Sequence, residues 1–415
     1  MEEKTILFRR DFTLVVIGQI ISLFGNGILR FALPLSLLRE TGSSALFGMV
    51  TACSFAPMVV LSMIGGVLAD RVNKRDIMIG LDFCTAILMF VFYFALGNLP
   101  TVPLFIAVLM LLYGISGIYQ PSVQASIPLL VPPEKLMAGN AVINQVNTLS
   151  GLLGPVIGGV MFGICGIRAI VVLSIICFAF SAIMEIFIQI PHEKRMRKKG
   201  VLAVAASDLK ESFRFVKSEK PVFFSVVFLI SIFNLVLSAV MIVGVPILIT
   251  QVLKMSDVMY GFTQGAIALG GLWGGILTAM TAEKRKLKDA YILLLICAVC
   301  VAFMGIPLLL RWSTVLSYGV ITLMCFITMG VSALFVVQIY TMIQKQTPPQ
   351  LVGKIMAALI SIAMCGQPVG QAIYGVLFDA FQEQTWIVLI AAAIASFAIS
   401  LYAKKIFSRL EEESM

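Results

Sequence analysis

The 415-residue chain is 60% hydrophobic and only 12% charged, and its mean hydropathy is +1.03. An ordinary soluble domain carries about 25% charged residues, so this composition excludes a soluble globular protein and indicates one embedded in a membrane. The formal net charge of +9 does not require a nucleic-acid partner, because cations also gather in the cytoplasmic loops of membrane proteins.

Twelve apolar runs follow one another along the chain, and each is long enough for a helix to cross ~30 Å of hydrocarbon. The runs are continuous and do not alternate with period two, which favours helices over a β-barrel. The predicted spans are 12–38, 44–69, 77–97, 102–128, 141–163, 167–190, 222–250, 258–281, 290–310, 314–341, 354–378 and 385–403.

A basic segment divides these runs into two groups of six. The predicted organisation is an N-terminal six-helix bundle at 1–190, a cytoplasmic basic linker at 191–221, a C-terminal bundle at 222–403 and a cytoplasmic tail at 404–415. Val131-Pro132-Pro133 is repeated by Thr347-Pro348-Pro349 at an offset of 216 residues, which indicates related halves. Two pseudo-symmetric bundles are typical of transporters that bind substrate between repeats.

The distribution of Lys and Arg predicts the orientation. With a cytoplasmic N-terminus, 25 of the 30 cations lie on the cytoplasmic side and Arg30 lies within a span. The outer side keeps four: Arg39, Arg168, Lys254 and Arg311. The positive-inside rule therefore predicts a multi-pass protein with both termini in the cytoplasm.

The turn after the second span carries a motif. Residues 65–75 read Gly-Gly-Val-Leu-Ala-Asp-Arg-Val-Asn-Lys-Arg, and they resemble the G-x-x-x-D-R-x-x-R-R signature of the major facilitator superfamily. Small residues such as Gly65 and Gly66 permit close helix approach. The resemblance implies a conformational latch on the cytoplasmic side, made by Asp70 and Arg71 with support from Lys74 and Arg75. The alternative is that these cations only set topology.

The fifth span carries a second motif, Gly154-Pro155-Val-Ile-Gly158-Gly159. It resembles the G-P-x-x-G-G of exporters associated with antiport, and the resemblance implies a hinge that keeps the pathway from leaking. Pro155 removes one backbone hydrogen bond and kinks the helix. A plain packing kink is the alternative.

Segments 18–33, 69–82 and 121–128 resemble one branch of the superfamily, which contains macrolide-efflux and siderophore-exporter-like proteins of bacteria. The resemblance implies a drug-resistance type of secondary active transporter in a bacterial inner membrane. It would export amphipathic small molecules (drug, macrolide-like, peptide or siderophore) by alternating access in exchange for protons. A lipid flippase or a solute importer of the same fold is the alternative, and a non-transport membrane protein ranks below both.

Three ionisable residues fall clearly within predicted spans: Arg30, Asp82 and Glu185. A charge there costs at least ~2.5–3.5 kcal/mol, so each requires a partner, a water-filled cavity or a function. Arg30 either holds an anionic substrate group, pairs with a carboxylate or snorkels outward. Asp82 either supports the Asp70–Arg75 loop or couples protons. Glu185 is a second candidate for proton coupling, or a water-exposed acid.

Amides complete the predicted cavity: Asn26, one turn before Arg30, and Gln19, Gln120, Gln124, Asn234, Gln264, Gln338 and Gln367. Asn140, Asn144, Asn147, Gly151, Gly154 and Gly158 share one helical face. That stripe either lines the cavity or packs against another helix.

Enzyme function is not indicated. The single histidine, His192, lies in the basic segment, and the sequence contains neither a Walker loop nor a His/Cys metal cluster. No metal and no cofactor are therefore expected, and an ATP-driven pump is excluded. The expected partners are the substrate, protons and the lipid bilayer, with no nucleic acid, and the chain is expected to act as a monomer.

Overall fold

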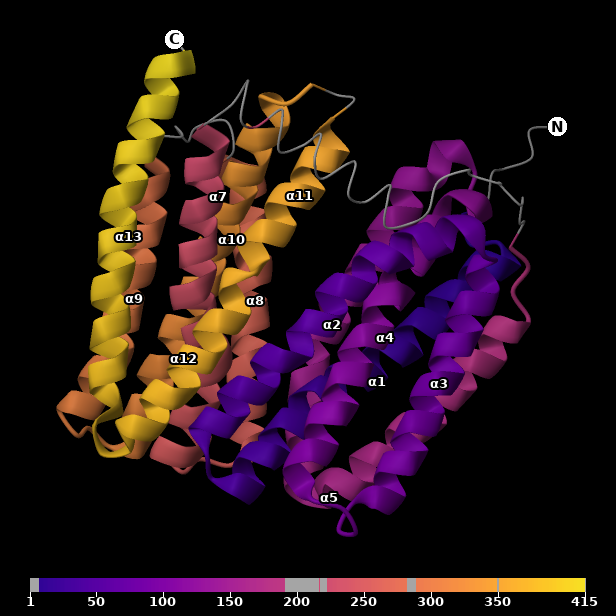
Figure 1. Cartoon of the computed structure of the whole chain (residues 1–415), viewed down its shortest axis with the longest axis horizontal. Helices are drawn as coiled ribbons and strands as arrows, with labels where there is room; N and C mark the ends of the chain where they lie inside the picture. Colours follow the sequence, from indigo (N-terminus) through magenta and orange to yellow (C-terminus); the bar gives the residue numbers. More distant parts are fainter. Residues whose placement is uncertain (1–6, 191–215, 217–221, 282–288, 349–350, 415) are drawn as a thin grey trace. The chain divides into compact units, whose positions relative to one another are not determined.

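A computed structural model describes residues 7–190, 216, 222–281, 289–348 and 351–414, and helices are the only regular secondary structure over these residues (Figure 1). The N-terminal helices are α1 (Arg10–Thr41), α2 (Ser44–Arg71), α3 (Lys74–Ala95), α4 (Thr101–Leu130), the 3-10 turn η1 (Pro133–Lys135) and α5 (Leu136–Ile186). The C-terminal ones are α7 (Val222–Phe233), η2 (Asn234–Ser238), η3 (Val240–Gly244), η4 (Ile247–Val252), α8 (Asp257–Thr281), α9 (Ala290–Leu309), α10 (Thr314–Lys345), α11 (Val352–Met364), α12 (Gly366–Ala380), η6 (Gln382–Gln384) and α13 (Thr385–Ser414).

Within the described residues, ten helical stretches are long and apolar enough to cross a membrane. One of them contains α5, which is interrupted at Gly166, where φ is +70°. Only glycine adopts this backbone conformation without strain. The predicted all-α membrane fold is confirmed, and α5 covers both the fifth and the sixth predicted runs.

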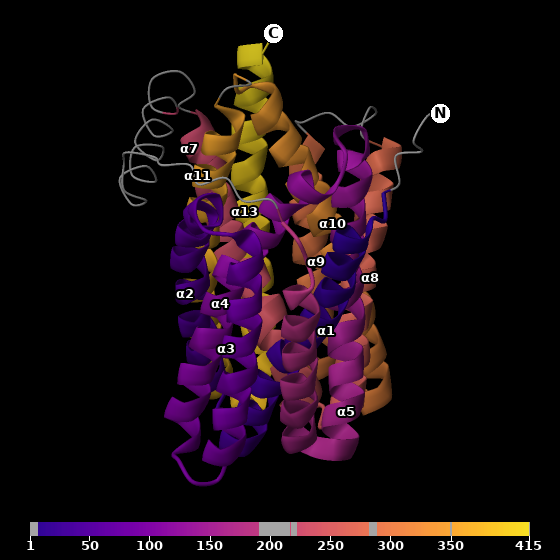
Figure 2. The ribbon, with the colours of Figure 1, turned by 90° about the vertical axis from the view of Figure 1, so that its right-hand side faces the viewer.

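The two limbs of α5 run in opposite directions along α1. In the first limb, Gly154 lies against Gly27 and Gly158 lies against Phe31, so this limb runs in the same direction as α1. In the second limb, Glu185 lies against Gly18 and Phe178 lies against Gly25, so this limb runs antiparallel to α1. Figure 2 shows α1 alongside both limbs. Gly166 therefore turns the chain back across the expected membrane thickness.

The chain forms two compact units. The first contains residues 1–41 and 53–204, and the second contains 42–52 and 205–415, each where the structure describes them. The basic linker predicted at 191–221 lies outside the described residues except for Val216. The tail predicted from 404 continues α13 as helix to Ser414.

A hydrogen-bonded cap ties the start of α2 into the second unit. The Asp379 carboxylate, at the end of α12, accepts from the Ser44 backbone N–H (3.1 Å) and from the Ser43 hydroxyl (3.3 Å). A carboxylate at a helix N-terminus satisfies a free N–H and opposes the positive end of the helix dipole. Ser44 also donates to Gln251 (3.2 Å). Residues 42–52 therefore belong with α12, although the chain on both sides of them belongs to the first unit.

Two of the predicted runs are not regular α-helices. The seventh begins as α7 and continues in π-helical turns through η2, η3 and η4, as in the Leu253 N–H bond to the Leu248 carbonyl. The eleventh is divided at Cys365 into α11 and α12. Hydropathy reports only the length of an apolar run, so it detects neither change of backbone hydrogen bonding.

Helices α2 and α4 approach closely at Gly65. A methyl group at this position would lie 2.7 Å from the Ile118 Cα and 2.9 Å from the Gly117 carbonyl oxygen. A methyl group at the neighbouring Gly66 would meet nothing within 4 Å. Of the two glycines expected to permit close approach, Gly65 is therefore the one at the contact.

Replacing Gly65 by Ala is predicted to destabilise the first unit by about 1–3 kcal/mol, because backbone atoms of α4 cannot move away without shifting the helix. Gly66→Ala is the matched control and should change stability by less than about 0.5 kcal/mol or raise it slightly. The measurement is the thermal unfolding midpoint of the purified protein, followed by circular dichroism. Equal shifts for the two variants would contradict the prediction.

Candidate functional site

A polar stripe runs along α1 through the core of the first unit. Gln19, Ser22, Asn26 and Arg30 are separated by three, four and four residues, so they share one face of the helix. Gln19 and Ser22 are fully buried, whereas Asn26 and Arg30 are half-buried. The stripe therefore extends from the sealed interior of the bundle to partly accessible surface.

Buried hydrogen bonds connect the first two stripe residues to both intramembrane acids. Gln19 donates to the Tyr119 hydroxyl (2.8 Å), and Tyr119 donates in turn to Glu185 (2.8 Å). Ser22 donates to Asp82 (3.1 Å). The Asp82 carboxylate also interacts with Ser181 and, electrostatically, with Glu185. Helices α1, α3, α4 and the second limb of α5 thus meet in one carboxyl network.

The carboxyl network has acidic groups without a balancing cation. No Lys or Arg in the described part of the chain forms an ion pair with Asp82 or Glu185, and both acids are buried, with 2% and 0% of their surface exposed. Three acceptor oxygens receive no hydrogen bond from any described residue: Gln19 Oε1, Asp82 Oδ2 and Glu185 Oε2. An ionised carboxylate only accepts, whereas a protonated one also donates. Protonation therefore supplies the donors that this network lacks.

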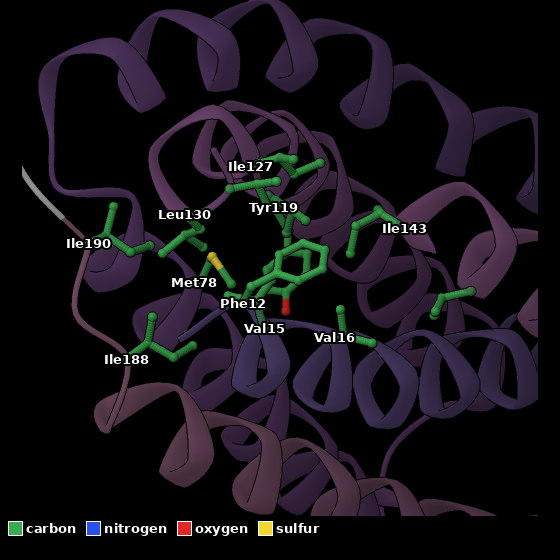
Figure 3. Packing of buried hydrophobic residues seen from close by; sticks show 13 residues of the cluster. Phe12, Val15, Val16, Met78, Tyr119, Ile127, Leu130, Ile143, Ile188 and Ile190 are labelled. Atoms are coloured by element: carbon green, nitrogen blue, oxygen red, sulfur yellow. The ribbon is translucent and has the colours of Figure 1, made fainter. Parts of the chain in front are cut away.

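An apolar cluster covers one end of the carboxyl network. It is built from the starts of α1 and α3, the second half of α4, the first limb of α5 and the segment after α5. Its members are Phe12, Val15, Val16, Met78, Tyr119, Val123, Ile127, Leu130, Val131, Ile143, Val146, Ile188 and Ile190. Figure 3 shows Ile188 and Ile190 directed toward the same cluster as Met78 and Leu130. Tyr119 belongs to both the apolar cluster and the carboxyl network, because its ring packs in the cluster while its hydroxyl donates to Glu185.

Two polar contacts hold the segment after α5 over the cluster. The Gln189 backbone N–H donates to Asp11 (3.0 Å), and the Arg75 guanidinium donates to the Ile186 carbonyl at the end of α5. A cation at a helix C-terminus satisfies a free carbonyl and opposes the helix dipole. Arg75, expected to support a latch, therefore connects the start of α3 to the end of α5.

Asp82 is held against α1 by its bond to Ser22, eight residues inside α3. This contact places Asp82 in the carboxyl network, and its two predicted roles, support of the Asp70–Arg75 loop and proton coupling, stay predictions. Glu185 is buried, which contradicts the alternative prediction that it is a water-exposed acid. Arg30 lies further along α1, where its guanidinium stacks on the Tyr113 ring of α4 at 4.2 Å from the ring centre.

Four of the other predicted cavity residues lie outside the carboxyl network. In α4, Gln120 is half-buried and Gln124 is exposed. In the second unit, Asn234 donates to the Ala363 carbonyl (3.1 Å) and accepts from Ser238 (2.9 Å), and Gln264 donates to Tyr260 (2.8 Å). Asn234 therefore links the seventh run to α11.

The predicted latch is described only in part. The side chain of Asp70 lies outside the described residues, and Arg71 and Lys74 are half-buried at the end of α2 and the start of α3. Asn73 caps α3 by accepting from the Arg75 backbone N–H (3.1 Å). These contacts shape the turn, and the latch role stays a prediction.

The predicted hinge lies at a tight helix crossing. A methyl group at Gly154 would lie 3.0 Å from the Gly27 Cα, and one at Gly158 would lie 3.1 Å from the Phe31 ring. Gly159 is buried and Pro155 half-buried within α5. On the polar stripe of this helix, Gly154 and Gly158 pack against α1, while Asn140, Asn144 and Gly151 are exposed.

Sequence reasoning missed Ser22, Ser181 and Tyr119 as members of the site. Ser22 was detectable, because it continues the three- and four-residue spacing of Gln19, Asn26 and Arg30. Tyr119 carried no such signal, since an isolated tyrosine in an apolar helix is ordinary. The Asp379 cap was likewise missed, because its partner Ser44 is 335 residues away in sequence.

Known transport proteins are similar to this chain along nearly its whole length. Macrolide efflux protein A of Streptococcus pyogenes is 23% identical over 409 residues, covering 96% of each chain. The enterobactin exporter EntS of Shigella boydii is 25% identical, covering 88% of this chain and 84% of the relative. Among solved structures, the nucleoside transporter NupG matches with a TM-score of 0.75 at 12% identity, covering 96% of this chain and 99% of that one.

The model of the Major Facilitator Superfamily matches residues 15–371. The matched residues begin just before Gln19, the first residue of the carboxyl network in sequence. They include the rest of the first unit and most of the second unit. These two relatives are named as an efflux protein and an exporter, in agreement with the branch whose motifs the chain resembles. The chain is therefore a multi-pass membrane transporter that belongs to the major facilitator superfamily.

Proposed function

We propose that this chain exports amphipathic small molecules in exchange for protons, and that Asp82 and Glu185 form its proton site. The observation that carries the proposal is the burial of two interacting carboxyl groups in one network without a cation. Two ionised carboxylates in such a site repel one another and lack solvation, so at least one of them is expected to hold a proton.

A proton held in this way is available for exchange during the transport cycle. When the bundle rearranges and water reaches the network, the cost of ionising a carboxyl group falls and the proton can leave. The network supports this role further, because its bonds come from four helical segments. A relative movement of any one segment changes the hydrogen bonds on an acid.

The relatives support export and the class of substrate. One is named as a macrolide efflux protein and another as an enterobactin exporter. The chain also contains 22 Met and 29 Phe, side chains that adapt to bulky apolar ligands. We propose a substrate of this kind, carried by a single chain.

The charge distribution supports a cytoplasmic location for both termini, and the relatives support a bacterial inner membrane. In this orientation the apolar cluster lies between the carboxyl network and the cytoplasm. The latch at Asp70 and Arg71 and the hinge at Gly154-Pro155 are proposed to control the exchange of access, with Gly158 and Gly159 allowing α5 to move against α1.

Replacing Asp82 by Asn together with Glu185 by Gln is predicted to uncouple transport from protons. In proteoliposomes with an acidic interior, protons leaving through the wild-type protein should drive accumulation of a labelled macrolide. Coupling between two bound ligands is commonly worth ~5–150-fold, so the double variant should lose about tenfold or more of this accumulation. The measurement is labelled macrolide inside the vesicles, with and without a protonophore.

Glu134→Gln is the control, because Glu134 is an exposed acid at the start of the 3-10 turn η1. It should accumulate the macrolide as the wild type does. Proton-driven accumulation that survives the double substitution would refute the proposed proton site. Macrolide movement in the opposite direction under the same gradient would favour the alternative of a solute importer.

Tyr119→Phe is predicted to lower the stability of the first unit by about 1–3 kcal/mol, because buried Gln19 and Glu185 both lose a hydrogen-bond partner while the ring stays in place. Tyr93→Phe, at a half-buried position of α3, should change stability by less than about 0.5 kcal/mol. The readout is thermal unfolding of the purified protein. A Tyr119 variant as stable as the wild type would show that the hydroxyl contributes nothing to the network's stability.

A further inference from the structure

Arg30 is a cation deep within a membrane-spanning helix. At 1.5 Å per residue, about 16 Å of helix separates it from Thr41 and about 30 Å from Arg10, the two ends of α1. This distance is longer than an arginine side chain can bridge, so outward snorkelling to the membrane surface does not account for it. Its guanidinium instead lies over Tyr113, and its Nε is buried without a hydrogen-bond partner.

The acids of the carboxyl network do not neutralise Arg30. Asp82 and Glu185 bond to Ser22 and Tyr119. Ser22 lies eight residues before Arg30, about 12 Å along the helix axis. Within the described residues, no carboxylate forms an ion pair with Arg30. Burying the charge costs at least ~2.5–3.5 kcal/mol, and a cation–π contact returns only ~0.5–2 kcal/mol.

The groups around Arg30 fit an anionic ligand. A guanidinium presents a planar set of donors that matches a carboxylate in two parallel hydrogen bonds. Ser150, whose carbonyl lies against Gly27 one turn before Arg30, has a buried hydroxyl without a partner in the described part of the chain. The Tyr113 ring fixes the guanidinium and offers an aromatic face to the apolar part of a ligand.

We propose that Arg30, positioned by Tyr113, binds the anionic group of those amphipathic substrates that carry a carboxylate-like head. Arg30 is half-buried, which leaves its guanidinium partly accessible to a ligand. Its depth in the helix argues against a phospholipid headgroup as the occupant. The inference rests on the proposed export function for its physiological meaning, whereas binding is measurable without transport.

The test compares a dansyl-labelled undecanoic acid with its methyl ester, which has the same apolar body but no charge. Binding to the full-length protein is followed by dansyl fluorescence in nanodiscs of phosphatidylcholine. The wild type should bind the acid about tenfold more tightly than the ester, as expected for loss of a charge-assisted pair of hydrogen bonds. Arg30→Gln should abolish this preference, and Arg30→Lys should retain part of it.

Arg168→Gln is the matched control, because Arg168 is an exposed cation just beyond the turn at Gly166. It should keep the preference of the wild type. Tyr113→Leu should weaken acid binding while leaving ester binding within about twofold, since the charge remains but its platform is lost. Thermal unfolding of each variant identifies a loss of binding that is caused by misfolding. If Arg30→Gln does not fold, the acid and ester affinities of Arg30→Lys are compared with those of the wild type instead.

A wild-type protein that binds the acid and the ester equally, or an Arg30→Gln variant that keeps the preference for the acid, would overturn the inference. A preference that disappears when anionic phosphatidylglycerol replaces phosphatidylcholine would assign the site to lipid and also overturn it. The Asp82→Asn, Glu185→Gln variant separates the two proposals. If it loses proton-driven transport but keeps the preference for the acid, the anion site and the proton site are distinct.

Discussion

The burial of two carboxyl groups between α1, α3, α4 and α5 is the constraint on which the first unit depends. Asp82 and Glu185 are sealed from water and receive too few donors from the protein. A purely apolar core would avoid the cost of burying them. Their placement within a network of Gln19, Ser22 and Tyr119 supports the proposed proton site, because an acid retained within a membrane at such a cost is by default a candidate functional group.

The first unit is layered along the axes of its helices. On α1, apolar Phe12 and Val16 come first, followed by Gln19 and Ser22 of the carboxyl network, and then by Arg30. Helix α4 passes through the same layers in the reverse order, from Tyr113 through Tyr119 to Leu130. The carboxyl network and the Arg30 side chain thus lie about 12 Å apart on the same pair of helices.

Helix α2 connects this arrangement to the second unit. Its first turns are held by Asp379 and Gln251, whereas its later part packs on α4 at Gly65. Both attachments rely on short distances: a hydrogen-bonded cap at one end and a glycine crossing at the other. One continuous helix therefore has its first turns in one compact unit and its remainder in the other.

The sequence by itself determined the fold class, because apolar runs of membrane length leave helices as the only way to satisfy the backbone in lipid. It also identified Arg30, Asp82 and Glu185, since a charged residue in an apolar run is conspicuous. Only the tertiary structure decided which of them meet. Asp82 and Glu185 come together because two limbs of α5 fold back at Gly166 beside α1, and Arg30 remains apart because it lies two turns further along that helix. Hydropathy registers how far a residue is from water along the chain, but side-chain pairing depends on helix rotation and on partners distant in sequence, such as Tyr119 for Gln19 or Asp379 for Ser44.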